Sequence, residues 1–411
     1  MSIDLDRNNQ KIIGAIIKYN RIKQNMNQKT LAQGICVPSY LSRIENGDIS
    51  PSDDVISIIF NKLGLTFNDS PEFIEKNKKA FDLFFHELHF NEFDYTINQF
   101  EEIKSKEQDF ITSPLIIDYL LVKLARYCST PNRDEFENAN SLLLSTFDLL
   151  SNNQKFIYYF YVGVDTLNIS GDHNKGKEYI MNALSYKETG HCYFWLSYVY
   201  RIENNPIKAY DNIKKALDIY VAEGNIISIM SSYEKIAEVY FMLNNYSDAI
   251  QYIDMALNIA HKLKNNYHIE HLNSLLAWSY YRLENYDKAM TYLNLNSGLI
   301  DHRMIIPDAL IECLIYFNLN DKVSLKSSIS KLKSDTSIEH LGSDLVKILF
   351  DFFNFYLEHP DYIKNPIWER LLIYIIESTN KLVELKKVFS YLLKKFYIKN
   401  RRYKDVLSIN S

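Results

Sequence analysis

A set of small and aromatic residues recurs along this 411-residue chain, in two steps of 40 residues and one of 33. The clearest copy is IAEVYFMLNNYSDAIQYIDMAL (236–257). A fixed period of this length indicates stacked units that bury a continuous core only when they lie together. The recurring positions hold, copy by copy, Val164, Leu167, Gly176, Ile180 and Ala183; Ser197, Tyr200, Ala209, Ile213 and Ala216; Ala237, Tyr240, Ala249, Ile253 and Ala256; and Ala277, Tyr280, Ala289 and Leu293, with Asn296 in the last place.

The small residues let the two helices of a unit approach closely, and the Tyr fills the groove between them. This pattern resembles the tetratricopeptide repeat, although two units are 40 residues apart and the usual terminal Pro is missing. The resemblance implies a right-handed α-solenoid of helix pairs, clearest over 157–300. Residues 80–150 and 305–405 keep helical periodicity but lose the signature, so we expect degenerate repeats there.

Composition agrees with an all-α chain. Only 11 Gly and 9 Pro leave little room for the many turns of a β architecture. Four cysteines are scattered without a CxxC pair, which argues against a zinc site or a disulfide framework. The start, MSIDLDRNNQ, does not read as a secretory signal, and no apolar run is long enough to span a bilayer. We therefore expect a cytoplasmic protein with no membrane contact.

The first 66 residues carry the signals of short helices. Residues 12–25 have helical apolar spacing, Asn27 is suited to cap QKTLAQG, and Gly34 is suited to end it. Pro38 fits the first turn of PSYLSRIEN, where its missing N–H costs nothing. Two short helices joined by a tight turn, the second polar at its N-terminal end, predict a helix-turn-helix.

The spacing within PSYLSRIEN directs Leu41 and Ile44 inward and leaves its polar side chains outward. Gly47 permits a left-handed exit from this helix. The next helix is expected to open with Ser50 as its cap and Pro51 in its first turn.

Charge is distributed unevenly along the chain. The formal net charge is −5, yet residues 7–44 contain seven Lys or Arg and no Asp or Glu. A basic stretch on an acidic protein indicates a local site for a polyanion.

The stretch NQKTLAQGICVPSYLSRIENGDISPSDD resembles the helix-turn-helix of the phage-repressor superfamily. It is still more similar to the heads of the peptide-pheromone regulators of Gram-positive bacteria, the RRNPP class, of the NprR and PlcR types. Ile35-Cys36 in the turn departs from the wider superfamily and matches this subgroup. The resemblance implies a five-helix DNA-binding domain over 1–66, linking helices over 67–115 and a peptide-binding solenoid over 116–405.

Carried over position by position, the resemblance gives each matching residue of the head a role. Arg21 and Glu45 match the ion pair that ties the first helix to the end of the recognition helix. Arg43 suits a bidentate contact with guanine, against the alternative of a solvated surface arginine, and Tyr40 is as well suited to packing as to DNA. The DNA-binding residues are predicted to be Gln28, Ser39, Tyr40, Ser42, Arg43 and Asn46.

The inner face of a solenoid suits an extended peptide. The first helix of each unit is expected to present its repeat positions 5, 9, 12 and 13 to that face. Arg201 and Arg282 are suited to holding a peptide carboxylate, against the alternative of an unoccupied wet groove. The peptide-binding residues are predicted to be Asp165, Asn168, Tyr198, Arg201, Glu238, Phe241, Trp278, Tyr281 and Arg282.

No cofactor, metal or catalytic site is predicted. GDHNKGKE (171–178) matches the start of a phosphate-binding loop, but Glu178 stands where a Ser or Thr is needed. Two pairs of His three residues apart lack a third ligand. No nucleophile–base arrangement is evident, so we do not expect an enzyme.

The favoured function is a quorum-sensing transcription regulator that binds double-stranded DNA as a homodimer and is switched by a short signalling peptide. The alternative, also implied by the resemblance, is a scaffold that binds a response-regulator protein of a phosphorelay and inhibits or dephosphorylates it. The helical stretch 70–115 would serve that second role.

Overall fold

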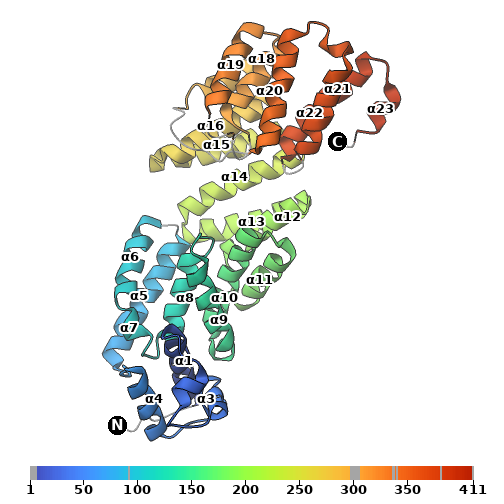
Figure 1. Cartoon of the computed structure of the whole chain (residues 1–411). Coiled ribbons are helices and arrows are strands. Elements are labelled where there is room, and N and C mark those ends of the chain that lie inside the picture. Colours follow the sequence, from blue (N-terminus) through green and yellow to red (C-terminus); the bar gives the residue numbers. More distant parts are fainter. Residues whose placement is uncertain are drawn as a thin grey trace. The chain divides into compact units, whose positions relative to one another are not determined.

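The computed structural model describes residues 7–90, 93–296, 306–335, 338, 341–379 and 382–409. Within them the chain forms helices and turns only. It divides into two compact units, 1–228 and 229–411. The predicted all-α fold is confirmed (Figure 1). Residues 297–300, at the end of the clearest predicted repeats, lie outside the described residues.

The head contains α1 (Arg7–Lys23), α2 (Gln28–Ala32), α3 (Pro38–Glu45) and α4 (Asp53–Leu63). The rest of unit 1 is formed by α5 (Pro71–His89), α6 (Phe93–Ser105), α7 (Glu107–Phe110), α8 (Ile116–Tyr127), α9 (Arg133–Ser145), α10 (Asn152–Asp165), α11 (His173–Tyr186), α12 (Gly190–Ile202) and α13 (Pro206–Glu223).

The helix α14 (Ile226–Met242) leads into unit 2. That unit continues with α15 (Tyr246–Leu263), α16 (Asn266–Arg282), α17 (Tyr286–Leu293), α18 (Asp308–Asn318), α19 (Lys322–Ser334), α20 (Ser343–Glu358), α21 (Pro366–Ser378), α22 (Val383–Lys399) and α23 (Tyr403–Leu407). No helix of the described residues is both long and apolar enough to span a bilayer.

The head differs from the sequence-based expectation in two details. Its described residues up to 66 form four helices where five were expected, because the fifth helix begins only at Pro71 and pairs with α6. The last helix of the head begins at Asp53 with Ser52 at its N-cap, so the prediction of Ser50 as cap was wrong. Pro51 is buried, which places it in the packed connection before the helix rather than in the first turn.

The core of the head continues without a break into the body of unit 1. One cluster of buried side chains runs from Ile13 in α1 to Val162 in α10. Two polar contacts fasten α1 to the segment around α7. The Tyr19 hydroxyl donates to the Glu107 carboxylate at 2.9 Å, and the Asn20 side-chain amide donates to the carbonyl of Ile111 at 2.9 Å. The head is therefore braced against the first body helices.

The repeat residues pack as their size predicts. The small residues of the copy 236–257, Ala237, Ala249 and Ala256, are all fully buried. Tyr240 stacks on Tyr252 with ring centroids 5.5 Å apart, and the next copy repeats this contact with other tyrosines. Since a methyl group is the largest side chain on the three buried positions, the paired helices can lie close together.

The C-terminal part of unit 2 packs through aromatic rings instead. Trp368 of α21 stacks on Phe352 of α20 with centroids 4.3 Å apart. The Phe352 ring also meets the edge of Phe389 from α22 at 5.2 Å. Large rings therefore occupy the helix contacts here in place of small residues, in the part of the chain where the repeat signature fades although helix pairs continue.

The packing of the repeats generates a stability prediction. Ala249→Leu places three extra carbon atoms at a fully buried helix contact and is expected to lower the free energy of unfolding by about 1–3 kcal/mol. Ser247→Leu, two residues earlier on the exposed side of α15, is the matched control and should change it little. Urea denaturation followed by circular dichroism measures both. Equal effects would show that the helices do not depend on a small residue at position 249.

Candidate DNA interface and ligand-binding residues

The local sequence sets where α2 and α3 begin. The Asn27 side chain accepts a hydrogen bond from the backbone N–H of Thr30 at 2.8 Å and so caps α2. Pro38 occupies the first turn of α3. The turn between the helices contains Gly34, whose φ of +79° is the left-handed conformation that favours glycine. Leu41 and Ile44 are fully buried, as predicted, and fix the rotation of α3 about its axis.

A glycine lets α1 and α3 touch. A Cβ atom added to Gly14 of α1 would lie 2.2 Å from the backbone carbonyl oxygen of Ile44, near the end of α3. That distance is far below van der Waals contact, and backbone cannot move aside as a flexible side chain would. The end of the recognition helix is therefore held directly against the α1 backbone.

A buried ion pair fixes the same place. The Arg21 guanidinium donates through Nε to Glu45 Oε1 at 2.6 Å and through a terminal nitrogen to Oε2 at 2.9 Å. The Glu45 side chain is only 1% exposed. Arg21 also donates to the carbonyl of Met26 at 2.8 Å. A bidentate pair of this kind constrains orientation as well as distance, so it fixes the C-terminal end of α3 relative to α1.

Most of the predicted DNA-binding residues lie along α3, from its first turn to its C-cap. Ser39, Arg43 and Asn46 are exposed, whereas Tyr40 and Ser42 are half-buried. Tyr40 packs against the core of the head. Within the described residues no hydrogen bond or ion pair engages the Arg43 guanidinium, so it is available to an external acceptor. DNA contact by these residues remains a prediction.

Gln28 has a different local partner from the one predicted. Its side-chain amide donates to Glu45 Oε2 at 2.8 Å and thereby joins the Arg21–Glu45 pair. A contact with a DNA phosphate would have to compete with this hydrogen bond. This hydrogen bond has no local signal in the sequence, because Gln28 and Glu45 are 17 residues apart and meet only once both helices are in place.

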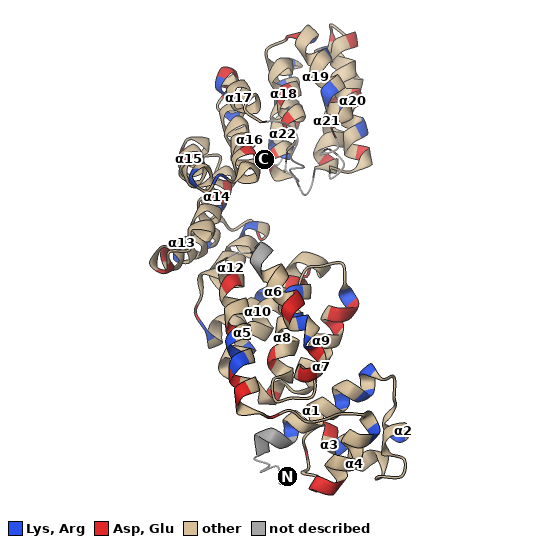
Figure 2. Ribbon diagram, turned by 90° about the vertical axis from the view of Figure 1, so that its left-hand side faces the viewer, with Lys and Arg blue, Asp and Glu red and all other residues tan. Residues whose placement is uncertain are grey.

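One apolar side chain beside the reading face was not predicted. Val37 stands at the N-cap of α3, is 63% exposed and makes no capping hydrogen bond. Lys and Arg mark the described ribbon of α1 and α2, which carries no Asp or Glu (Figure 2). The head thus combines positively charged helices, α1 and α2, with an exposed and largely polar face of α3.

The predicted peptide-binding residues of unit 1 fall into two groups. The buried Asp165 carboxylate pairs with the Arg133 guanidinium at 2.7 and 2.8 Å and accepts from the backbone N–H of Ser129 at 2.9 Å. Asn168 is exposed and donates to the Ser129 hydroxyl. Asp165 therefore holds the turn between α8 and α9. Tyr198 and Arg201, by contrast, are half-buried.

In unit 2 most of the predicted residues are covered. Glu238, Phe241, Trp278 and Tyr281 are buried, and Arg282 is half-buried. The Trp278 ring nitrogen and the Arg282 guanidinium both donate to a side chain of α22. The same helix reaches α14, where the Lys387 ammonium donates to the carbonyl of Phe241 at 2.8 Å, so α22 covers part of the predicted inner face. Peptide contact by these residues remains a prediction.

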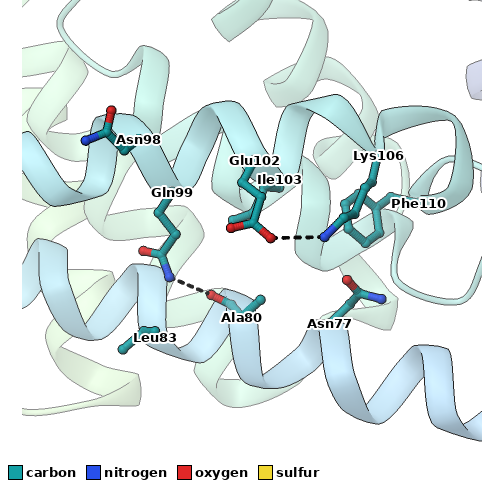
Figure 3. A pocket seen from close by; sticks show the side chains of 9 residues that line it. All are labelled: Asn77, Ala80, Leu83, Asn98, Gln99, Glu102, Ile103, Lys106 and Phe110. Carbon is teal, nitrogen blue, oxygen red and sulfur yellow. Dashed lines mark hydrogen bonds and ion pairs between the residues drawn. The ribbon is translucent and has the colours of Figure 1, made fainter.

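A small cavity lies between α5 and α6 (Figure 3). Its volume is about 270 Å³. The Gln99 amide nitrogen donates to the carbonyl of Ala80 at 3.4 Å, while its side-chain oxygen is buried without a partner in the described structure. Lys106 and Glu102 pair at 3.1 Å on the same wall. The remaining lining residues are Asn77, Leu83, Asn98, Ile103 and Phe110.

The comparisons with known proteins agree with this architecture. A helix-turn-helix family model matches residues 17–69, and a tetratricopeptide-repeat model matches residues 228–295. A search of curated proteins finds no match.

Several solved structures share the fold over most of the chain. A Rap protein complexed with competence and sporulation factor is 14% identical with a TM-score of 0.60, over 82% of this chain and 95% of that one. The apo form of the quorum sensor NprR from B. thuringiensis is 14% identical with a TM-score of 0.58, over 78% and 99%. Aspartyl phosphate phosphatase F from Bacillus subtilis is 14% identical with a TM-score of 0.51, over 80% and 91%.

These findings define a helix-turn-helix protein with a tetratricopeptide-repeat body. Its fold is that of NprR and the Rap proteins, so the resemblance to the RRNPP architecture is confirmed at the level of the fold.

The buried ion pair of the head generates a second prediction. Arg21→Met is expected to lower the free energy of unfolding by about 3–5 kcal/mol, because it leaves the Glu45 charge buried without its partner. Lys23→Met is the control, since the Lys23–Glu107 pair involves a lysine side chain that is 45% exposed, and it should cost less than about 1 kcal/mol. Urea denaturation of the full chain compares the two variants.

A double variant, Arg21→Met with Glu45→Met, distinguishes the lost pair from lost packing. It should recover part of the loss, because no unpaired charge then remains in the core. A cost for Arg21→Met no larger than that for Lys23→Met would contradict the structural role of the pair.

Proposed function

We propose that this chain is a transcription regulator that binds double-stranded DNA through its head and is switched by a short signalling peptide bound by its repeat body. In this proposal it acts in the cytoplasm, as a homodimer, and is not an enzyme. The observation that carries the proposal is the exposed face of α3, along which Ser39, Arg43 and Asn46 recur at helical spacing on a helix that is fixed by a buried ion pair.

The chemistry of that surface favours DNA over other polyanions. The exposed face of a recognition helix can enter the major groove of DNA. A guanidinium on that face can bind guanine through two hydrogen bonds. Surrounding lysines and arginines supply the contacts with phosphates that position the helix but read no sequence. One recognition helix reads only a few base pairs, so two symmetric copies are needed for specificity, which is the reason for proposing a homodimer.

The body offers a route by which a ligand would influence the head. The head shares its core with α5–α10, and α1 is tied to the Glu107 carboxylate and to the carbonyl of Ile111. A ligand that binds one arrangement of the body helices better than another shifts the population of both arrangements. The proposal is that such a shift changes how the two heads of a dimer meet their half-sites. The fold relative NprR has been solved in complex with its cognate peptide NprX.

The proposal predicts separable effects of two basic residues. Arg43→Ala is expected to weaken binding to the specific site by about 1–3 kcal/mol per lost base contact while leaving binding to scrambled DNA nearly unchanged. Lys29→Ala, an exposed change on α2, should weaken binding to both DNAs alike because a phosphate contact carries no sequence information.

The measurement is fluorescence anisotropy at one fixed salt concentration. The DNA comes from the regions flanking the gene, and a candidate peptide encoded beside it is titrated in. Absence of any sequence preference, with and without peptide, would refute the proposed function. A peptide-dependent change on specific DNA alone would support it and give the direction of the switch.

A second candidate function is binding of a response-regulator protein, with inhibition or dephosphorylation of that partner. The observation that favours it is the α5–α6 cavity, where the Gln99 side-chain oxygen is buried without a partner and Leu83 is 41% exposed on the rim. One of the fold relatives is an aspartyl phosphate phosphatase. This reading places the functional surface on α5 and α6 rather than on α3.

A substitution on that surface separates the two candidates. If the α5–α6 face binds a response regulator, Leu83→Asp should abolish capture of such proteins from lysate and leave DNA binding intact, because it adds a charge to an apolar contact. Arg43→Ala should have the opposite pattern. Mass spectrometry identifies what is captured. If neither the unmodified chain nor the Arg43 variant retains a response regulator, the second candidate is rejected.

A further inference from the structure

The carboxylate of Glu384, in the first turn of α22, is surrounded by hydrogen-bond donors of unit 2. Its Oε2 accepts from the Tyr246 hydroxyl at 2.7 Å, from the Trp278 ring nitrogen at 3.3 Å and from the Arg282 guanidinium at 3.0 Å. Its Oε1 accepts from the Lys387 ammonium at 2.7 Å. The Glu384 side chain is 12% exposed. Four convergent donors on one carboxylate are more than is needed to pin a helix end by a single ion pair.

Three of the four donors belong to the repeats. Tyr246 begins α15, and Trp278 and Arg282 lie on successive turns of α16. The Arg282 guanidinium lies over the Tyr246 ring at 4.6 Å and over the Trp278 ring at 5.7 Å. Aromatic faces on the guanidinium hold it in place without using its N–H groups. Contacts within the repeats therefore help to position the Arg282 guanidinium independently of its ion pair with Glu384.

Burial fixes the protonation of the phenol. It raises the pKa of Tyr246, and the neighbouring Glu384 carboxylate raises it further, so the hydroxyl stays protonated and acts as a donor. Together with the indole N–H and the guanidinium, it forms a positively charged set of hydrogen-bond donors that suits an anion. The chemistry of the site therefore selects a carboxylate.

The Glu384 side chain that fills this site belongs to α22, a helix that other side chains hold against the core. In α22 the buried residues Leu385 and Phe389 hold the helix against the core, while the adjacent Val383 is exposed. The hydrogen bonds from Trp278 and Arg282 bring the first turn of α22 against α16, and Figure 2 shows the two helices near each other. Rotation of the Glu384 side chain toward solvent would vacate the three donors and leave the rest of the helix in contact.

We propose that Tyr246, Trp278 and Arg282 form a carboxylate subsite for the signalling peptide, and that Glu384 occupies it as an internal ligand when the peptide is absent. This inference rests on the proposed function and adds to it the group that is recognised. A peptide carries such a group at its C-terminus or on an acidic side chain. Binding of either exchanges one carboxylate for another, and so detaches α22 from α16 at this point.

The first test supplies the carboxylate separately from the chain. Glu384→Ala removes the internal ligand and keeps the three donors. Sodium propionate provides the same group on a short stem, with propionamide as the uncharged control and sodium chloride to match ionic strength. Propionate is expected to give a saturable rise in the melting temperature of Glu384→Ala, because a ligand that binds only the folded state stabilises it.

The control variants define what would overturn the inference. The unmodified chain should show no comparable rise because Glu384 already fills the site, and Glu384→Ala with Arg282→Gln should show none because the site has lost its charge. A propionate effect that is absent from Glu384→Ala, or equal in all three proteins, overturns the subsite.

The second test uses Glu384→Gln, which keeps the size of the side chain if the Ala variant does not fold. Full-length proteins are incubated with a random hexapeptide pool bearing free C-terminal carboxylates, or with the same pool amidated, and retained peptides are measured by mass spectrometry. Glu384→Gln is expected to retain several-fold more of the carboxylate pool than the unmodified chain does. The double variant, Glu384→Gln with Arg282→Gln, should not show this gain.

The two pools separate the possible outcomes. Enrichment of Asp- or Glu-containing peptides from the amidated pool assigns the subsite to an acidic side chain instead of the terminus. Retention of peptides without preference for any carboxylate overturns the subsite and leaves peptide binding standing. No retention by any variant overturns both the subsite and peptide binding by the repeat body.

Discussion

The repeat body depends on close contact between paired helices. The side chains at these contacts are no larger than a methyl group. Ala237, Ala249 and Ala256 are fully buried where the helices of their unit meet, and Ala277 and Ala289 of the next unit are fully buried at the first two of these positions. Because such contacts recur at a fixed period, each unit stacks on its neighbour in the same way and the core continues from one to the next. The stacked tyrosine pairs beside them fill the groove between the two helices of each unit.

Buried carboxylates hold the places where this regular packing is interrupted. Glu45 joins the end of the recognition helix to α1, Asp165 holds the turn between α8 and α9, and Glu384 joins α22 to α16. Each is paired with an arginine, whose planar donors fix direction as well as distance. A buried charge is costly when its partner leaves, so these links are specific but also sensitive. The third differs from the others in that three uncharged or cationic groups of the repeats converge on one oxygen.

The head and the body of unit 1 form one packed structure rather than two domains on a flexible tether. The core that begins in α1 continues to α10, and the hydroxyl of Tyr19 and the amide of Asn20 bond to the segment around α7. The direction in which Arg43 points is therefore set by the body as well as by the head. Under the proposed function, this coupling is the route by which a ligand on the body would influence DNA binding.

The sequence by itself determined the elements and the class of fold. Repeat spacing, the Asn27 cap, Pro38 and the inward pair Leu41 and Ile44 are local signals, since each depends on residues within one or two helical turns. It also indicated which side chains of α3 face outward. What it could not give was the start of α4, where the burial of Pro51 decided the boundary, or the hydrogen bond from Gln28 to Glu45.

Only the tertiary structure decided what the inner positions of unit 2 touch. Repeat periodicity placed Trp278 and Arg282 on the inner face, but Glu384 lies about a hundred residues further along the chain and has no repeat signature. Which segment returns to cover a stack of helices depends on small rotations added over every preceding unit. No local pattern contains that sum, so the sequence indicated Trp278 and Arg282, whereas the fold alone brings Tyr246 and the Glu384 carboxylate to them.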